Sequence, residues 1–392
     1  VVNQGTMQAK NGGTLLIAVN GSGVSNSGVL LADVGSTVAF SGATITGGAL
    51  NSNGSGRFAA TSSGSNFLRG VTLNGQLDMA GAYSVERALD GMVLNGTVNI
   101  GNASIFAPQG DNTISGSGSI VFADNNGYNR LNVEAGNLVL GSGITVRGDT
   151  GVIGNQVWAG GAATLTNNGV INADAGGTIT VAVNGVTTNN GLMRAQNGTL
   201  TVNSPLVNNG TLRADAAGVV NLPTNFANDG LMTGVGSFAL TGTLTNNGHV
   251  TPGTPGGEPG ALTLNGKYAQ GATGSFDVGL DGLNFGSLAV SGSASLDGTI
   301  GVICQGACDY AAGTSWIVMM TGGSNLVTGT FDGPVAMTGF SSGAFTVNYL
   351  PNEVVLYVTT ATVGAVPEPA TFALLLAGLA AVGFASKRRR PA

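Results

Sequence analysis

A short motif, Asn-Asn-Gly, recurs about every 20 residues in the middle of the chain and limits what the chain can fold into. The copies begin at Asn167, Asn189, Asn208 and Asn246, and a variant, Asn-Asp-Gly, begins at Asn228. Each copy is followed by an alternating stretch such as Val-Ile-Asn-Ala or Thr-Leu-Arg-Ala, whose period of two is that of a β-strand. A constant repeat of this length is typical of a solenoid with one coil per repeat. We therefore expect the asparagines to stack as a ladder at one turn of successive coils.

The alternation also assigns side chains to two faces. Apolar residues at one position of the repeat are expected to face the interior: Met7, Ile171, Met193, Leu212, Met232 and Val250. Residues 2–9 read as a further copy, and no signal peptide precedes them. We therefore expect the printed sequence to begin inside a coil and to lack its N-terminal part.

Composition favours strands and turns throughout. Glycine supplies 68 of the 392 residues, and only 8% of residues are charged, so helix-forming Lys and Glu are scarce. We predict an all-β fold with a β-solenoid of ~20-residue rungs over residues 1–265, on the order of a dozen coils. Past a Pro- and Gly-rich stretch at 251–260 the period stops. We assign residues 266–362 to a β-rich C-terminal cap that covers the last open edge, and residues 363–392 to a separate tail.

The expected cap contains short strand-and-turn segments that resemble a known family. They include Gly274-Ser275-Phe276, Leu288-Ala289-Val290 and Gly329-Thr330-Phe331. This run resembles the C-terminal end of autotransporter-type passenger domains, which have a pectin-lyase-like β-helix. The resemblance implies that the body is a right-handed parallel β-helix. It departs from that family because the tail stands where the family has its membrane domain.

The tail has three features in a fixed order. Val366, Pro367, Glu368 and Pro369 come first, an apolar stretch follows at 370–385, and the basic residues Lys387, Arg388, Arg389 and Arg390 close it. Sixteen helical residues reach roughly 24 Å, which makes the stretch a short transmembrane helix at the lower limit of a span. Because Lys and Arg stay on the cytoplasmic side, everything before Pro367 is expected outside the inner membrane.

This order of features resembles the PEP-CTERM sorting tail, which exosortase-type membrane peptidases are thought to recognise and remove. The resemblance implies bacterial export, a transient exosortase partner and processing near Pro367–Pro369. It also implies an inner-membrane-anchored precursor that is released to the cell envelope or the extracellular matrix.

Charge and cysteine content narrow the classes of partner and cofactor. Without the four basic residues and one acidic residue of the tail, the formal net charge of the body is −9. The body has no basic stripe that could bind a phosphate backbone, so nucleic acid is not an expected partner. Cys304 and Cys308 are the two cysteines, and the spacing leaves a local disulfide and free thiols both open. Zinc is disfavoured because no third or fourth soft ligand is visible. We expect no metal and no cofactor.

Candidate catalytic residues are few. Asp174 and Asp215 follow equivalent strands and are interpreted as turn residues. His249, the single histidine, aligns with outward positions, and Arg194 and Arg213 are interpreted as a solvated face, although they could form a small strip for sugars or anions. We name no catalytic residue and no binding site.

The leading functional hypothesis is a non-enzymatic, adhesin-like or structural rod whose polar faces contact exopolysaccharide or other surface glycans through many weak contacts. The alternative is a carbohydrate-active β-helix enzyme, a polysaccharide lyase or hydrolase, with its acids near Asp78, Glu86 and Asp90.

Overall fold

The computed structural model is a long stack of β-strands, and it describes residues 1–365 except 19–22, 155–160, 255–257, 323 and 325. The strands form a parallel β-solenoid of about 13 turns, with two large sheets of 28 and 16 strands. The described residues contain no helix. Each turn contributes up to three strands, which we call sides one, two and three in chain order; sides one and two belong to the larger sheet and side three to the smaller one.

The strands of side one stack in sequence order: β1 (Val2–Asn3), β4 (Gly23–Asn26), β7 (Thr44–Thr46), β14 (Ile105–Pro108), β17 (Arg130–Leu131), β20 (Gly151–Gly154), β23 (Thr178–Ala182), β26 (Thr199–Val202), β29 (Val219–Asn221), β37 (Ser287–Val290) and β40 (Ser315–Thr321). Four long strands continue from side one into side two: β10 (Phe67–Leu73), β12 (Val85–Leu94), β32 (Ser237–Asn246) and β34 (Ala261–Gln270).

Side two consists of β2 (Thr6–Ala9), β5 (Val29–Ala32), β8 (Ala49–Ser52), β15 (Asn112–Ser115), β18 (Gly136–Leu140), β21 (Ala163–Asn167), β24 (Thr187–Asn189), β27 (Leu206–Asn208), β30 (Phe226–Asn228), β38 (Ala294–Leu296) and β41 (Val327–Gly329). Side three consists of β3 (Thr14–Ile17), β6 (Thr37–Phe40), β9 (Arg57–Ala60), β11 (Gln76–Met79), β13 (Thr97–Ile100), β16 (Ser119–Phe122), β19 (Thr145–Gly148), β22 (Val170–Ala173), β25 (Leu192–Ala195), β28 (Thr211–Ala214), β31 (Leu231–Gly234), β33 (His249–Pro252), β35 (Ser275–Asp281), β39 (Thr299–Cys304) and β42 (Ala336–Thr338).

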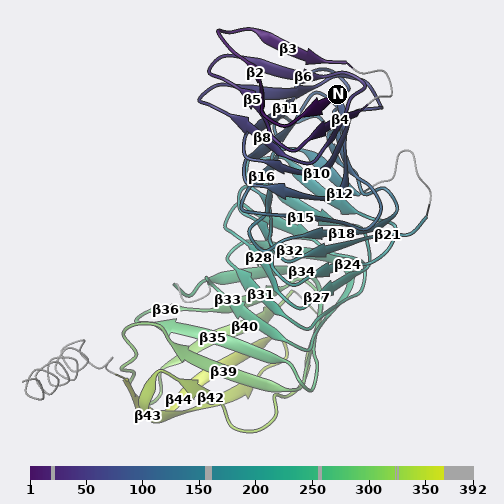
Figure 1. The fold of residues 1–392 in the computed structure, drawn as a ribbon. Coiled ribbons are helices and arrows are strands. Elements are labelled where there is room, and N and C mark those ends of the chain that lie inside the picture. Colours follow the sequence, from purple (N-terminus) through teal and green to yellow (C-terminus); the bar gives the residue numbers. More distant parts are fainter. Residues whose placement is uncertain (19–22, 155–160, 255–257, 323, 325, 366–392) are drawn as a thin grey trace, which may run out of the picture.

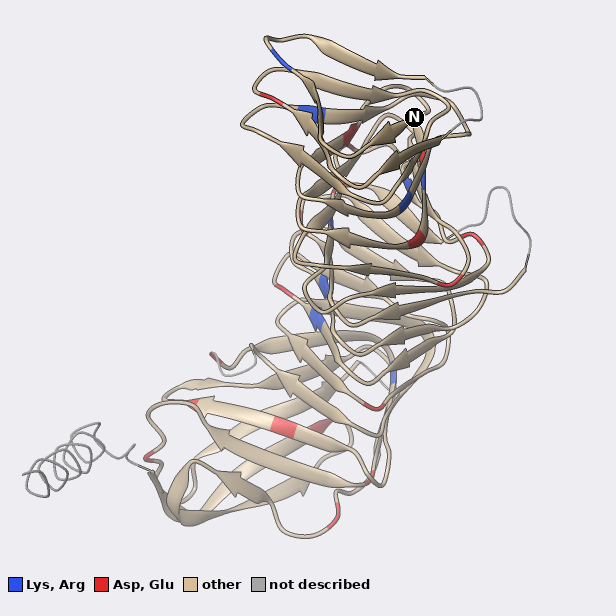
Figure 2. Cartoon of the chain, in the orientation of Figure 1, with Lys and Arg blue, Asp and Glu red and all other residues tan. Residues whose placement is uncertain are grey.

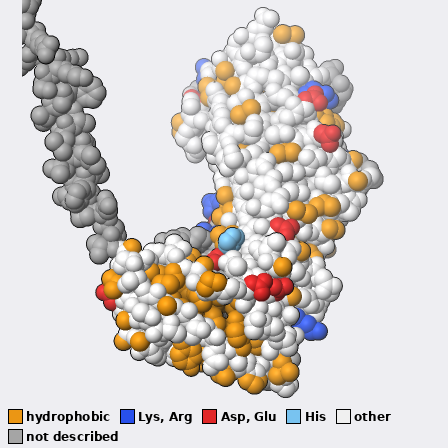
Figure 3. All heavy atoms as spheres, turned by 90° about the horizontal axis from the view of Figure 1, so that it is seen from below, with side chains coloured by type: hydrophobic (Ala, Val, Ile, Leu, Met, Phe, Trp, Pro, Cys, Tyr) orange, Lys and Arg blue, Asp and Glu red, His pale blue; other side chains and the backbone are white. Residues whose placement is uncertain are grey.

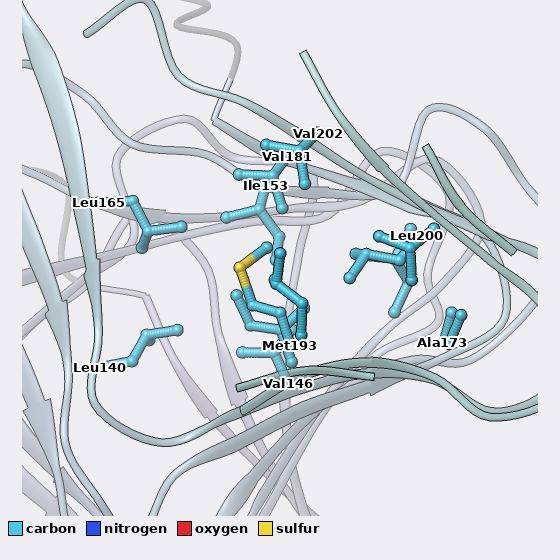
Figure 4. Packing of buried hydrophobic residues seen from close by; sticks show 14 of the residues in the cluster. Leu140, Val146, Ile153, Leu165, Ala173, Val181, Met193, Leu200 and Val202 are labelled. Carbon is cyan, nitrogen blue, oxygen red and sulfur yellow. The ribbon is translucent and has the colours of Figure 1, made fainter. Parts of the chain in front are cut away.

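The hydrophobic core runs along the inside of the stack as columns of side chains. On side three, Ile171, Met193, Leu212, Met232 and Val250 are in register from strand to strand, and all are fully buried. Leu140, Leu165, Val181 and Met193 come from different sides and point into one shared interior (Figure 4). The period-two alternation therefore places one apolar residue per strand in a common core, because successive side chains of a strand lie on opposite faces.

The alignment of Met7 with Ile171 is wrong. Met7 lies on side two, in register with Leu30 and through it with Leu50, whereas Ile171 lies on side three. The first copy of the motif turns the corner between sides one and two, and the copies from Asn167 onward turn the corner between sides two and three. The same motif serves both corners because each needs the same tight change of direction.

The parallel register continues across residue 265. β34 stacks on β32, β35 on β33, and β37 to β42 add further strands in the same order. The end of the sequence period at 251–260 is therefore not a break in strand pairing, although the lower part of the stack is tilted relative to the upper part (Figure 1). Among the described strands, antiparallel pairing occurs where β36 (Asn284–Phe285) pairs with β35, and where β43 (Phe340–Tyr349) and β44 (Glu353–Gly364) close the end of the stack. Two isolated antiparallel bridges also join Gly253 to Gly234 and Pro259.

The sorting residues 366–369, the apolar stretch 370–385 and the basic residues 387–390 lie outside the described residues. Across the part of the chain that the structure does describe, there is no helix of the length and apolar character needed to cross a membrane.

Candidate functional site

A buried ladder of side-chain amides runs along the corner between sides two and three. The ladder consists of Asn167, Asn189, Asn208, Asn228 and Asn246, and each of the first four donates from Nδ2 to Oδ1 of the asparagine in the next coil at 2.7 to 2.9 Å. The ladder ends on Gln270, whose Oε1 also accepts from the hydroxyl of Tyr268. All five asparagines are fully buried. The ladder satisfies polar groups inside the corner and is therefore structural.

A second amide ladder lies one residue further on and is exposed to solvent. Asn190 donates to Asn168 at 2.9 Å, and Asn209 donates to Asn190 at 3.0 Å. The first half of the stack repeats this arrangement with Asn51, Asn74 and Asn95. These rows place regularly spaced donors and acceptors on the outer surface.

The outward charges of side three are paired with one another. Arg194 and Arg213 both bind the carboxylate of Asp215, with Nε to oxygen distances of 2.7 and 2.6 Å. Arg147 binds Asp174 in the same way at 3.0 Å. The two arginines that we interpreted as a solvated face are thus ion-paired, and the two aspartates do more than shape turns. Charged residues are sparse and scattered over the stack (Figure 2).

His249 lies on the surface, in register with Leu231 and Ser275. Its Nδ1 is 2.8 Å from Oδ2 of Asp277, and the hydroxyl of Ser275 donates to Oδ1 of the same carboxylate at 2.6 Å. The serine therefore bonds the aspartate rather than the histidine. Nucleophile activation needs a bond between serine and histidine, so this trio does not form a catalytic triad.

The three acids of the enzyme hypothesis lie in different environments. Asp78 lies on side three, 3.7 Å from Arg57, and Asp90 at the corner of β12 pairs with Arg69. Glu86 is fully buried, and among the described residues neither of its carboxylate oxygens has a hydrogen-bond partner. This burial raises the pKa of the Glu86 carboxyl well above its usual range, against a smaller opposing effect of the nearby Arg87. The structure does not bring these acids together in one groove.

Metal ligands do not gather either. Within the described ranges, no group of three or more His, Cys, Asp or Glu side chains is placed to hold a metal ion.

A disulfide lies next to the point at which the chain leaves the stack. The sequence alone had left a disulfide and free thiols both open. Cys304 and Cys308 are bonded, and Cys308 is buried. Next to them, the backbone NH of Gly364 donates to Oδ1 of Asp309 at 2.9 Å. This turn therefore holds the end of the last strand, β44, two residues before Val366.

The surface near this exit differs from the rest of the molecule. Apolar side chains gather on the end of the stack (Figure 3). Leu283 is 94% exposed, and Met320 and Leu326 are about half exposed. No Lys or Arg occurs between Lys267 and Lys387. The end of the stack is therefore acidic and partly apolar.

Comparison with known proteins identifies the tail. Residues 365–390 match the PEP-CTERM protein-sorting motif. This motif implies an exported protein that is sorted to the cell surface through a membrane-anchored stage and a transient interaction with an exosortase. No curated protein matches the chain.

Proposed function

We propose that this protein is a non-enzymatic, adhesin-like or structural rod of the bacterial cell surface or extracellular matrix. Its polar faces contact exopolysaccharide or other surface glycans. An exosortase removes its tail near Pro367–Pro369, and the rod is then released from the inner membrane.

The observation that carries this proposal is the exposed amide ladder. Its members, among them Asn168, Asn190 and Asn209, are held side by side at the spacing of the coils, about 4.8 Å. Such a row offers one weak polar contact per coil to a long, repetitive ligand. Many weak contacts along a rigid face give avidity without a dominant residue.

The separation of the acids supports a non-enzymatic role. Glycoside hydrolysis needs two carboxylates on either side of one bond. Here Asp78 and Asp90 are each paired with an arginine, and Glu86 is enclosed in the core. We therefore propose no enzymatic step.

The proposed sorting step is tested by a triple variant in which Pro367, Glu368 and Pro369 are all replaced by alanine. The wild-type protein is expected outside the cell as a form that ends near Pro369, while the variant accumulates as full-length precursor. Intact mass and cell fractionation measure both. Thr360→Ala, an exposed change on β44, serves as the control. An unprocessed wild-type protein that stays in the membrane would contradict the processing step.

The binding part is tested by co-sedimentation of the protein with exopolysaccharide from the producing cells. We expect the protein in the pellet and no new reducing ends or unsaturated sugars in the supernatant. Time-dependent release of such products would show instead that the protein is an enzyme.

A further inference from the structure

Two tyrosines of the solenoid stand out because they are exposed, whereas most of the aromatic side chains described in neighbouring coils are buried. Tyr83 is 70% exposed and Tyr128 is 68% exposed. Phe58, Phe106 and Phe122, from neighbouring coils, are enclosed in the core. A large aromatic ring left in water without a structural partner is typical of a contact surface.

The register of the strands places both tyrosines at one corner of the stack. β12 pairs with β14 so that Val85 faces Ile105, and β14 pairs with β17 so that Ile105 faces Arg130. Counting back two residues aligns Tyr83, Ala103 and Tyr128 in three successive coils. The two tyrosines therefore emerge from the same corner two coils apart, about 10 Å along the stack.

The coil between them has no aromatic ring at the matching position. Ala103 occupies the matching position there, and its small side chain is buried. Directly beneath, Ser84, Ser104 and Asn129 form a buried polar column, in which Ser84 NH bonds Ser104 Oγ and Ala103 NH bonds Asn129 Oδ1. These hydrogen bonds hold the backbone of the corner in place beneath the exposed rings of Tyr83 and Tyr128.

The backbone at this corner is held in an uncommon conformation that turns the first ring outward. Tyr83 has a φ of 57°, and Ala103 in the next coil has a φ of 62°. A bulky residue rarely adopts a positive φ, and this conformation persists only where surrounding contacts enforce it. The NH of Tyr83 bonds the carbonyl of Asn102, and the NH of Tyr128 bonds Oδ1 of Asn126.

Fixed polar groups lie between the two rings. Asn102 is exposed, and its backbone NH donates to Oδ2 of Asp124 at 2.8 Å. Oδ1 of Asp124 accepts from the NH of Asn126 and from Nδ2 of Asn129. The edge thus alternates an aromatic ring, a polar turn and a second aromatic ring.

We propose that this edge, which we call the tyrosine edge (Tyr83, Asn102, Asp124 and Tyr128), binds a polysaccharide chain that runs parallel to the long axis of the stack. One sugar ring stacks on Tyr83 and another on Tyr128. The hydroxyls of the sugars between them meet Asn102 and Asp124. The spacing of about 10 Å is on the order of the length of two linked pyranose units, so every second sugar would reach a ring.

Sugar fits this edge better than a protein partner. Tight protein interfaces have a broad, desolvated apolar core. Here each ring stands alone among asparagine, glycine, serine and aspartate, and the side chain between the rings is an alanine. The apolar face of a pyranose needs only one aromatic ring, and its hydroxyls need polar neighbours. This inference rests on the proposed glycan-contacting role and gives it a location.

The test is affinity electrophoresis of the full chain in native gels that contain hydroxyethyl cellulose, xylan or dextran. Tyr83→Ala and Tyr128→Ala should each weaken retardation roughly tenfold, and the double variant should lose nearly all of it. Tyr83→Phe and Tyr128→Phe should bind within about twofold of wild type, because the ring remains. Leu283→Ala removes an even more exposed apolar side chain from the other end of the molecule and should change nothing.

Chain length gives a readout that a purely structural role would not move. Soluble β-1,4-linked gluco-oligosaccharides of two to six units compete for binding. With wild type, competition should strengthen once an oligosaccharide spans both tyrosines. With either single variant, the longer oligosaccharides should compete no better than the shorter ones. Circular dichroism confirms that each variant is folded.

The outcomes separate this inference from the proposed function. Retardation that is unchanged in the double variant overturns the tyrosine edge and leaves a glycan-contacting rod in place. Wild-type protein that is retained neither by these gels nor by exopolysaccharide from the producing cells removes both. Self-association that depends on the tyrosines and not on sugar, seen by sedimentation velocity, assigns the edge to a protein contact and overturns the inference.

Discussion

Residues 1–265 and residues 266–365 form one continuous parallel stack. Within it, each of the two regions is stabilised by different kinds of side chain. In the first region, amide ladders repeat from coil to coil, and arginine–aspartate pairs link neighbouring coils at several places. In the second, the ladder stops at Gln270, there is no arginine, and Lys267 is the last basic residue before the tail. The second region is stabilised instead by aromatic packing, the disulfide and two antiparallel strands.

The difference follows from the position of each region in the stack. A coil with a neighbour above and below can use the same side chain as its neighbours, because like groups stack in register. The last coil has no such neighbour and must cover its open edge with irregular packing. Tyr310, Trp316 and Phe345 form such a cluster, with ring centroids 4.8 and 6.5 Å apart.

The largest expected effect is on the aromatic cluster. Trp316→Ala should destabilise the end of the stack by about 4 kcal/mol, because it empties a buried aromatic site. Hydrogen exchange should show faster exchange in β40, β43 and β44 and little change before residue 265. Ile317→Ala, one residue away and 39% exposed, is the control. Equal loss of protection along the whole chain would mean that the two regions unfold as one unit.

A second prediction compares the two amide ladders at adjacent residues. Asn208→Ala should cost about 2 kcal/mol, because it leaves the buried Oδ1 of Asn228 without its donor. It also removes the shortest bond of Asn189 Nδ2, which keeps its bond to the carbonyl of Thr211. Asn209→Ala, in the exposed ladder, should cost less than about 0.5 kcal/mol. Thermal and denaturant unfolding measure both. Similar costs for the two variants would show that the buried ladder is not what holds the corner.

The third prediction concerns Glu86, a fully buried acid whose two carboxylate oxygens have no hydrogen-bond partner among the described residues. Above the usual pKa of glutamate, the unfolded chain loses the proton of this carboxyl while folded Glu86 keeps it. The free energy of unfolding should therefore fall as pH rises from that value toward the raised folded pKa, by up to about 1.4 kcal/mol per pH unit. At lower pH both states hold the proton and the loss disappears.

Glu86→Gln removes this titration and keeps the shape of the side chain. Its stability relative to wild type should increase from pH 4 to pH 8, as measured by urea unfolding at each pH. Asp90→Asn, at an exposed ion pair, is the matched control. A constant difference across this range would show that Glu86 is ionised in the folded protein.

Much of the solenoid could be predicted from local sequence. Strand period, inward positions such as Met193 and Leu212, and the stacking of Asn189 on Asn208 all follow from residues that repeat at a short, regular spacing. The alignment of Met7 failed because the same motif can serve either corner. The motif predicts a tight turn but does not indicate which of the two corners of the coil it forms.

The sequence by itself determined that the chain forms stacked parallel coils and carries a sorting tail, because both follow from short patterns of residues that are close together in the chain. The tertiary structure alone decided that Arg194 and Arg213 share Asp215, that Cys304 bonds Cys308, and that Tyr83 and Tyr128 lie at one corner. The physical reason is register. The length of every intervening turn shifts which residues meet between coils, and these lengths vary from coil to coil.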